Sequence, residues 1–352
     1  MPDHMKIKHR IFRRTMRNIH TLLAYPACLL EMIRCKTSPY HINSFATHTT
    51  AVYAYLLSRG YSEWIDALIF GPRLWRSPRP RQAETNCPKL LQGLTQVGYA
   101  HNEQNLSVDN LIEDLKKLQF IGRVANDKHS LDELEKNHLD VRGRYDAEEA
   151  SLMSLQSFAR LVTSEEVHQI ARAIMGERYL LTSALVWASF ACDNTFQAMA
   201  SAQIFHMDYD YLDDIKLFVN LSDTDSTSGP LEYVAGSHRP GHKKIWSSES
   251  IPEERVWRMH GIEKRSLFTG KKGEVYISDN RGLHRDAPPS RGAWKLAIQV
   301  NFSRNQFGSE KVYASQRVTL SPDWPSYSIW SKVLHAQPYV YSLLFSPQSR
   351  TI

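Results

Sequence analysis

The 352-residue sequence contains four cysteines, and no two of them form a CxxC pair. Cys28, Cys35, Cys87 and Cys192 are too few for a disulfide scaffold of this length, and their spacing argues against a cysteine-rich zinc site. A reducing cytoplasm is therefore the expected location.

The sequence also lacks zinc-finger spacing, an RNP-type aromatic motif and any long block of lysine and arginine. Lysine and arginine number 43 against 37 aspartates and glutamates, a small excess for this length. We therefore expect no nucleic-acid partner, and the excess fits a positively biased surface or a small anionic ligand. The oligomeric state is left open.

A long apolar run is missing as well. Residues 6 to 36 are basic and then apolar, but the apolar stretch TLLAYPACLL contains a proline and is far shorter than the roughly 20 residues that span a bilayer. The pattern favours an amphipathic helix docked on the protein, and it leaves weak membrane association of this segment open.

Composition along the chain predicts three parts. Residues 1 to 70 are expected to form a helical N-terminal extension. Residues 71 to 100 form a linker or extended arm, because four prolines and four arginines interrupt regular structure between 71 and 89. Residues 101 to 352 then form one folded domain.

Two helices are predicted early in that domain. Residues 107 to 122 have an apolar side, with Ser107 as the N-cap and Gly122 as the end. Residues 163 to 176 begin with a Thr163–Glu166 capping box and end at Gly176.

Strand-like segments follow after about residue 178. They are short, rich in β-branched and aromatic residues, and separated by turns: 179 to 190, 215 to 221, 274 to 278 and 294 to 302. Helices followed by strands predict an α+β protein with an antiparallel sandwich or barrel in its C-terminal half.

Chemistry is concentrated in FHMDYDYLDD, residues 205 to 214. In an extended segment, His206 and Asp208 point to the same face, where an imidazole and a carboxylate can bind one cation. An ordinary acidic loop is the alternative. His284, which follows the strand-like GEVYIS, supplies a third ligand. Two histidines and one carboxylate form the facial triad of non-haem Fe(II) oxygenases.

The segment WKLAIQVNFS, residues 294 to 303, has a two-residue periodicity, with apolar residues on one face and a face that is polar except for Ala297 on the other. Lys295 lies on the polar face with Gln299 and Asn301. A cation at this position suits the carboxylate of an acidic co-substrate. A solvated lysine on a half-exposed strand is the alternative.

These motifs resemble those of phytanoyl-CoA dioxygenase-like proteins. The similarity rests on TSGPLEYVAGSHR at 227 to 239, together with the preceding HxD, the LSD at 221 to 223, the GE at 273 to 274 and His284. It is dense from about 200 to 305 and extends faintly back to about 110.

The resemblance implies a double-stranded β-helix (jelly-roll) core with flanking helices. It also implies Fe(II) held by His206, Asp208 and His284, with 2-oxoglutarate and O2 as co-substrates. The reaction would consume a small-molecule or natural-product substrate and release succinate and CO2. Because related halogenases lack the carboxylate ligand, Asp208 favours hydroxylation, or a similar desaturation or cyclisation.

The resemblance also suggests residues that bind the co-substrate. The family usually has arginine where Lys295 stands, so Lys295 is the expected partner of 2-oxoglutarate, with Arg291 as the alternative. Gln203 and Gln299 are further candidates, and Tyr209 flanks the triad. Asp210, Asp213 and Asp214 are expected to be loop carboxylates, while Ser237 and His238 shape a turn.

Two other functions remain open from the sequence. One is a cupin-like metalloenzyme without redox chemistry, which would keep the triad and not need Lys295. The other is a non-catalytic interaction protein that retains the fold and uses residues 1 to 100. Nothing in the sequence identifies the substrate.

Overall fold

The computed structural model describes residues 87–102, 105–177, 179–208, 214–239, 250–303, 318–337, 340–341 and 344–345. The expected helical extension, residues 1 to 70, and the greater part of the expected arm lie outside this range. The predicted three-part division therefore stays a prediction. Among the described residues, no helix is long and apolar enough to cross a membrane.

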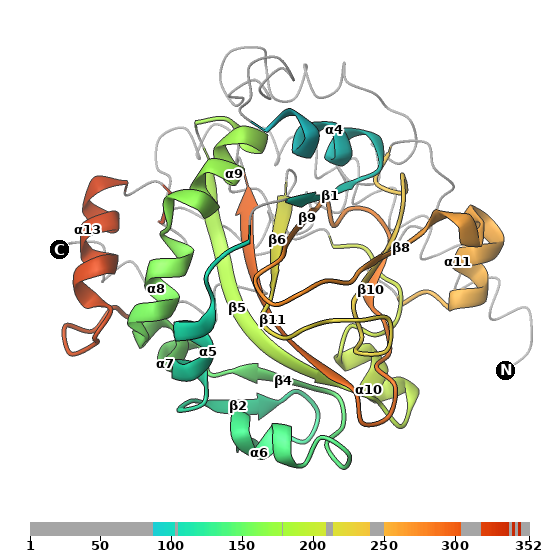
Figure 1. Ribbon diagram of the computed structural model, residues 1–352, viewed down its shortest axis with the longest axis horizontal. Coiled ribbons are helices and arrows are strands. Elements are labelled where there is room, and N and C mark those ends of the chain that lie inside the picture. The colour runs from blue at the N-terminus through green and yellow to red at the C-terminus, as the bar shows by residue number, and fades with distance from the viewer. Residues whose placement is uncertain are drawn as a thin grey trace, which may run out of the picture.

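Two antiparallel sheets form the centre of the protein (Figure 1). The larger sheet has the order β1 (Tyr99–Asn102), β9 (Val275–Ser278), β6 (Asp214–Asn220), β11 (Trp294–Ser303), β5 (Leu180–Phe190), β4 (Arg144–Ala147), β2 (Gln119–Gly122) and β3 (Lys128–Ser130). The smaller sheet has the order β10 (His284–Asp286), β7 (Leu231–Val234) and β8 (Arg265–Phe268).

The two-residue periodicity of β11 divides its side chains between two environments. Leu296, Ile298, Val300 and Phe302 belong to the main core. On the opposite face, Ala297 belongs to a second cluster that both sheets supply: Trp187, Phe218, Tyr276, Leu231, Tyr233 and Phe268. The larger sheet therefore has one face on the helices and the other face toward the smaller sheet.

Helices cover the outer face of the larger sheet. Figure 1 shows α8 and α9 following the long strand β5, with α13 outermost. The helices on this side are α4 (Pro88–Gln96), α5 (Asp109–Leu115), α7 (Glu149–Ser154), α8 (Gln156–Val162), α9 (Glu165–Met175) and α13 (Tyr327–Ala336). The other helices among the described residues are α6 (Leu131–Lys136), α10 (Thr195–Ala200), α11 (Glu253–His260) and the 3-10 turn Ile262–Lys264. This arrangement confirms the expected α+β class with a two-sheet, jelly-roll type of core.

The first predicted helix is shorter than expected. Helix α5 starts after Val108, so Ser107 is not its cap, and the helix ends at Leu115. Residues 119 to 122 form β2, which pairs with β4 and buries Phe120 completely. Gly122 therefore ends a strand. Only glycine fits at this position, because a Cβ there would lie 2.3 Å from a carboxylate oxygen of Asp127.

The second predicted helix is confirmed except at its cap. Ser164, one residue after the predicted Thr163, accepts a hydrogen bond from the backbone N–H of Val167. Thr163 instead follows helix α8 and donates its hydroxyl hydrogen to the carbonyl of Ala159. Gly176 ends the helix with a φ of +82°, a conformation that favours glycine.

Two further boundaries differ from expectation. Residues 88 to 102, mostly assigned to the arm, form α4 and β1, and β1 pairs with β9 in the larger sheet. Asp214, expected in the acidic loop, is the first residue of β6 and is buried. Tyr209, Asp210 and Asp213 lie outside the described residues.

Candidate metal centre

Backbone pairing brings the HxD segment beside β10. The N–H of His206 donates to the carbonyl of His284 at 2.9 Å, and the N–H of His284 donates back at 3.0 Å. Two residues further along, the N–H of Asp208 donates to the carbonyl of Asn280 at 2.8 Å. The segment thus extends the smaller sheet, and this pairing places residues 78 positions apart against each other.

The three predicted ligands converge. One ligand atom from each of His206, Asp208 and His284 lies within 4.8 Å of the other two. The Asp208 carboxylate is 3.7 Å from Nε2 of His206 and 3.3 Å from Nε2 of His284. Both Nδ1 atoms face backbone carbonyls at 2.9 Å, those of Ile204 and Gly282.

These carbonyls determine which imidazole nitrogen carries hydrogen. An Nδ1–H that donates to a carbonyl leaves Nε2 as the lone-pair nitrogen, which is the arrangement of metal-binding histidines. Two Nε2 lone pairs and a carboxylate therefore face one point. The donor set fits Fe(II) with open coordination positions.

Charge around Asp208 keeps its carboxylate ionised. Burial alone would raise the pKa of Asp208, but Lys216 and His284 outweigh burial and hold it well below its usual range. Nζ of Lys216 lies 2.5 Å from the carboxylate. Burial, followed by the neighbouring His284, lowers the pKa of His206, so that imidazole is neutral and free to coordinate a metal at neutral pH.

Asn280 is a fourth polar group at this point. Its Nδ2 lies 3.3 Å from Oδ2 of Asp208 and 3.0 Å from Nε2 of His284, and its Oδ1 accepts a hydrogen bond from the Ser278 hydroxyl. The Ser278 bond orients the amide so that it donates toward the ligand cluster. Asn280 therefore helps to hold the Asp208 carboxylate in place.

A cavity of about 210 Å³ opens beside the three ligands. Its lining combines the triad, several cations and aromatic side chains: Arg123, Arg144, Leu185, Trp187, Ala202, His206, Asp208, Lys216, Phe218, Leu231, Asn280, His284, Asp286 and Gln299. A second cavity, of about 350 Å³, adjoins it and shares Arg123 and Arg144 as lining residues.

Two arginines in this lining share one carboxylate. Nε and Nη2 of Arg144 lie 2.8 and 2.7 Å from Oδ1 of Asp146, and Nε of Arg123 lies 2.5 Å from Oδ2. Arg144 is buried, and its guanidinium lies 4.3 Å from the centroid of the Trp187 ring.

Lys295 is buried on the predicted polar face of β11, but it does not line this cavity. Its Nζ lies 2.6 Å from Oδ1 of Asp286. It borders a separate space of about 10 Å³, which Trp187, Phe218 and Leu231 also line. Burial lowers the pKa of Lys295, and Asp286 opposes that effect.

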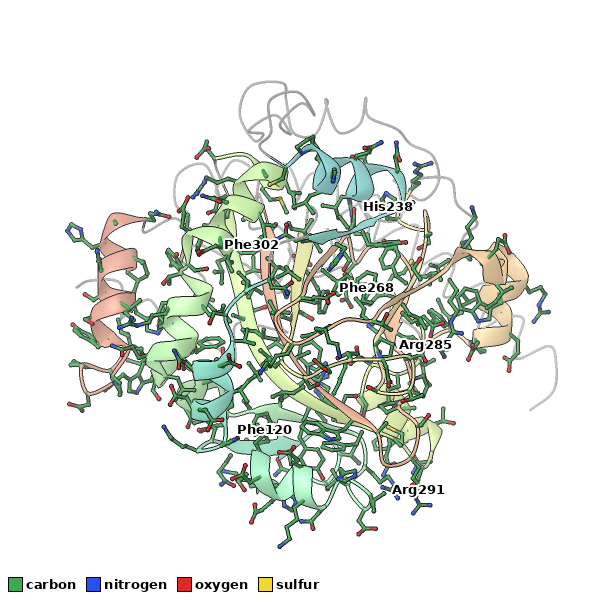
Figure 2. All side chains as sticks on the ribbon, in the orientation of Figure 1. Phe120, His238, Phe268, Arg285, Arg291 and Phe302 are labelled. Atoms are coloured by element: carbon green, nitrogen blue, oxygen red, sulfur yellow. The ribbon has the colours of Figure 1, made fainter. Side chains whose placement is uncertain are left out.

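Of the other residues predicted to bind the co-substrate, one lies at the cavity and two lie elsewhere. Gln299 lines the cavity, whereas Gln203 is buried elsewhere and donates to the Phe190 carbonyl at 2.7 Å. Arg291 is exposed on the turn before β11, and Figure 2 shows it at the edge of the molecule. Ser237 and His238 lie in a turn, as expected, where the Ser237 hydroxyl donates to the Val234 carbonyl.

The sequence reading missed Arg144, Lys216 and Asn280. Alternation along 214 to 220 puts Lys216 on the same face as Phe218 and opposite the core residue Leu217. This alternation is a sequence signal that Lys216 faces the site. Arg144 lies 62 positions before the HxD motif in a four-residue strand, and nothing local links it to the site.

The comparison with solved structures finds 188 similar chains. The epimerase SnoN, crystallised with Fe3+, alpha-ketoglutarate and nogalamycin RO, is 17% identical with a TM-score of 0.42, covering 61% of this chain and 82% of its own. HygX from Streptomyces hygroscopicus, with nickel and 2-oxoglutarate, is 14% identical (TM-score 0.44; 67% and 92% covered). EctD from S. alaskensis with bound Fe is 15% identical (TM-score 0.42; 65% and 79% covered). The comparison with curated proteins finds no match.

The family comparison covers more than half of the chain. Residues 94 to 288 match the model of phytanoyl-CoA dioxygenase (PhyH). The match contains all three residues of the His206–Asp208–His284 cluster. The chain therefore belongs to the phytanoyl-CoA dioxygenase family, whose enzymes are non-haem oxygenases that use Fe(II), 2-oxoglutarate and O2.

Proposed function

We propose that this oxygenase hydroxylates a C–H bond of a small-molecule substrate at an iron held by His206, Asp208 and His284, with release of succinate and CO2. The observation that carries the proposal is the complete triad, with both Nε2 atoms and the Asp208 carboxylate facing one point in the lining of a cavity.

Bound Fe(II), with 2-oxoglutarate and O2, supplies the oxidising power that amino-acid side chains lack. The chain's own residues prepare the site. The carbonyls of Ile204 and Gly282 hold the imidazoles in the metal-binding tautomer. Asn280 and Lys216 hold the Asp208 carboxylate. Trp187, Phe218 and Leu231 give the cavity apolar walls that limit the access of water.

Asp208 supports hydroxylation over halogenation, because the carboxylate takes the coordination position that a halide would need. The two adjoining cavities support a small-molecule substrate. The triad cavity, about 210 Å³, lies below the roughly 300 to 1,000 Å³ typical of ligand sites, and the adjoining cavity adds about 350 Å³. The co-substrate would occupy the triad cavity, and the body of the substrate would extend past Arg123 into the adjoining cavity.

The test is oxygen-dependent succinate formation. Purified protein loaded with Fe(II) under argon should release succinate from 2-oxoglutarate only after air is admitted. Asp208→Ala should abolish this release. Asp223→Ala is a matched control, because Asp223 is exposed and pairs with Lys271 at the surface.

The reaction type needs a second readout. Small molecules from an extract should be incubated with the enzyme under 18O2, and a hydroxylated product gains one labelled oxygen atom. Loss of two hydrogens without label would indicate desaturation or cyclisation. Oxygen-dependent succinate release that persists in Asp208→Ala would contradict the triad assignment.

A further inference from the structure

The co-substrate has two carboxylates, and the second one needs a cation that it can reach. Three cations line the cavity of the triad: Arg123, Arg144 and Lys216. Lys216 contacts the ligand Asp208 itself and therefore lies at the metal end. The distal carboxylate belongs at the other end, where the arginines and Lys295 are the candidates.

Arg144 and Lys295 occupy corresponding places on the sheet. Ser189 of β5 pairs with Arg144 of β4 on one side and with Lys295 of β11 on the other. Directly paired residues have side chains on the same face, so the two cations project from one face, about 10 Å apart across two strand spacings. Trp187 is near both cations, with its ring centroid 4.3 Å from the Arg144 guanidinium and 5.7 Å from Nζ of Lys295.

Lys295 already has a carboxylate partner from its own chain. Nζ of Lys295 lies 2.6 Å from Oδ1 of Asp286, and Trp187 Nε1 donates to Oδ2 of Asp286 at 3.2 Å. The space that Lys295 borders is about 10 Å³, room for roughly one water molecule. A second carboxylate beside Lys295 would lack this room and would be repelled by Asp286.

Arg144, in contrast to Lys295, has a nitrogen available for a further carboxylate. Its Nε and Nη2 face Asp146, and no hydrogen bond joins its Nη1 to a described residue. Among Arg123, Arg144 and Lys295, three positive charges face the two carboxylates of Asp146 and Asp286. Lys295 already faces Asp286 and the two arginines share Asp146, so Nη1 of Arg144 is the group that is left for an incoming carboxylate.

We propose that Arg144, and not Lys295, receives the distal carboxylate of 2-oxoglutarate. This rests on the proposed function, because it presupposes that 2-oxoglutarate binds at the triad. Lys295 is then a structural partner of Asp286 beneath Trp187. Arg123 shares Asp146, but its side chain is 39% exposed against 7% for Arg144, so Arg123 is the candidate to face the substrate.

The test compares two ligands by calorimetry, with Mn(II) bound to the protein so that no turnover occurs. One is 2-oxoglutarate, and the other is 2-oxovalerate, in which a methyl group replaces the distal carboxylate. The ratio of their dissociation constants isolates the distal contact. A charged hydrogen-bonded contact predicts a ratio of roughly 10 to 100 for the wild type.

Arg144→Gln should reduce this ratio to near 1 and leave 2-oxovalerate binding in place, which also shows that the variant is folded. Lys295→Gln and Arg123→Gln should keep the wild-type ratio, and Arg291→Gln, at an exposed position outside the cavity, is the matched control. Arg144→Lys keeps a cation but loses the planar fork, so it should retain part of the ratio. It serves as the test variant if Arg144→Gln does not fold.

Other outcomes overturn the inference. A ratio lost in Lys295→Gln or Arg123→Gln and kept in Arg144→Gln would assign the carboxylate to that other cation. A wild-type protein that binds Mn(II) but does not distinguish the two ligands would refute the distal contact itself. A wild-type protein that binds neither Mn(II) nor 2-oxoglutarate would refute the proposed function together with the inference.

Discussion

Nζ of Lys295 lies 2.6 Å from Oδ1 of Asp286, and each residue is about 4% exposed or less. The pair lies beneath the Trp187 ring, between the two sheets. A cation that the family resemblance assigned to the co-substrate is thus bound within the protein.

Asp286→Asn should destabilise the protein by about 3 to 5 kcal/mol, because it leaves the Lys295 charge buried without its partner. Urea unfolding measures the loss. Asp223→Asn, which breaks the exposed pair with Lys271, should cost less than about 1 kcal/mol. Replacing both members, as Asp286→Asn with Lys295→Met, should recover part of the loss. Equal losses for the buried and exposed pairs would refute the stabilising role of Asp286.

Removing one imidazole ligand should abolish metal-dependent stabilisation. Mn(II) at 100 times its dissociation constant should stabilise the wild type by about 2.7 kcal/mol, seen as a rise in melting temperature. His284→Gln should lose this rise. His238→Gln should keep it, since His238 lies in the turn after β7 and outside the ligand cluster. A rise that persists in His284→Gln would place the metal elsewhere.

Asn280→Ala should weaken metal binding about 10- to 100-fold, the usual effect of removing a group that orients a metal ligand. The reason is its Nδ2 contact with the Asp208 carboxylate. Competition with a chelating dye measures the affinity. Gln299→Ala is the control, because Gln299 lines the same cavity and donates to Asn301, away from the ligands. Similar metal affinities for both variants would remove Asn280 from the site.

Acid should weaken the fold through His168, far from the metal centre in sequence. Burial lowers the pKa of His168 to about 4, and its imidazole contacts the hydroxyls of Tyr179 and Tyr341. Between about pH 6.5 and 4 the unfolded chain binds the proton and the folded chain does not. The contribution of neutral His168 to the free energy of unfolding is therefore fully present above about pH 6.5. It falls by about 3 kcal/mol as the pH drops to about 4.

His168→Gln should flatten this part of the stability profile, which urea unfolding at a series of pH values measures. His335→Gln, at an exposed position of α13, should leave the slope unchanged. An identical slope for the wild type and His168→Gln would show that other groups cause the acid sensitivity.

Local patterns were sufficient for much of the fold. The alternation of residues 294 to 303 predicted β11 and its two faces, and the spacing of Val167, Ile170 and Ile174 predicted α9 with its end at Gly176. Local patterns gave the wrong secondary structure where pairing with a distant strand determines it. Residues 119 to 122 continue an apolar helical pattern, yet they form β2, because β4 offers backbone hydrogen bonds and Phe120 is buried in the main core.

The sequence by itself indicated the three candidate ligands, because HxD, His284 and the family signature at 227 to 239 are recognisable together without coordinates. Only the tertiary structure decided which cations face them. Arg144 and Lys216 reach the site through pairing of distant strands, and Asn280 reaches it from the turn between β9 and β10. Asp286 binds the lysine that the motif had assigned to the co-substrate. The physical reason is that periodicity indicates the face of a strand, whereas the partner of a buried charge depends on which side chains the fold brings within about 3 Å of it.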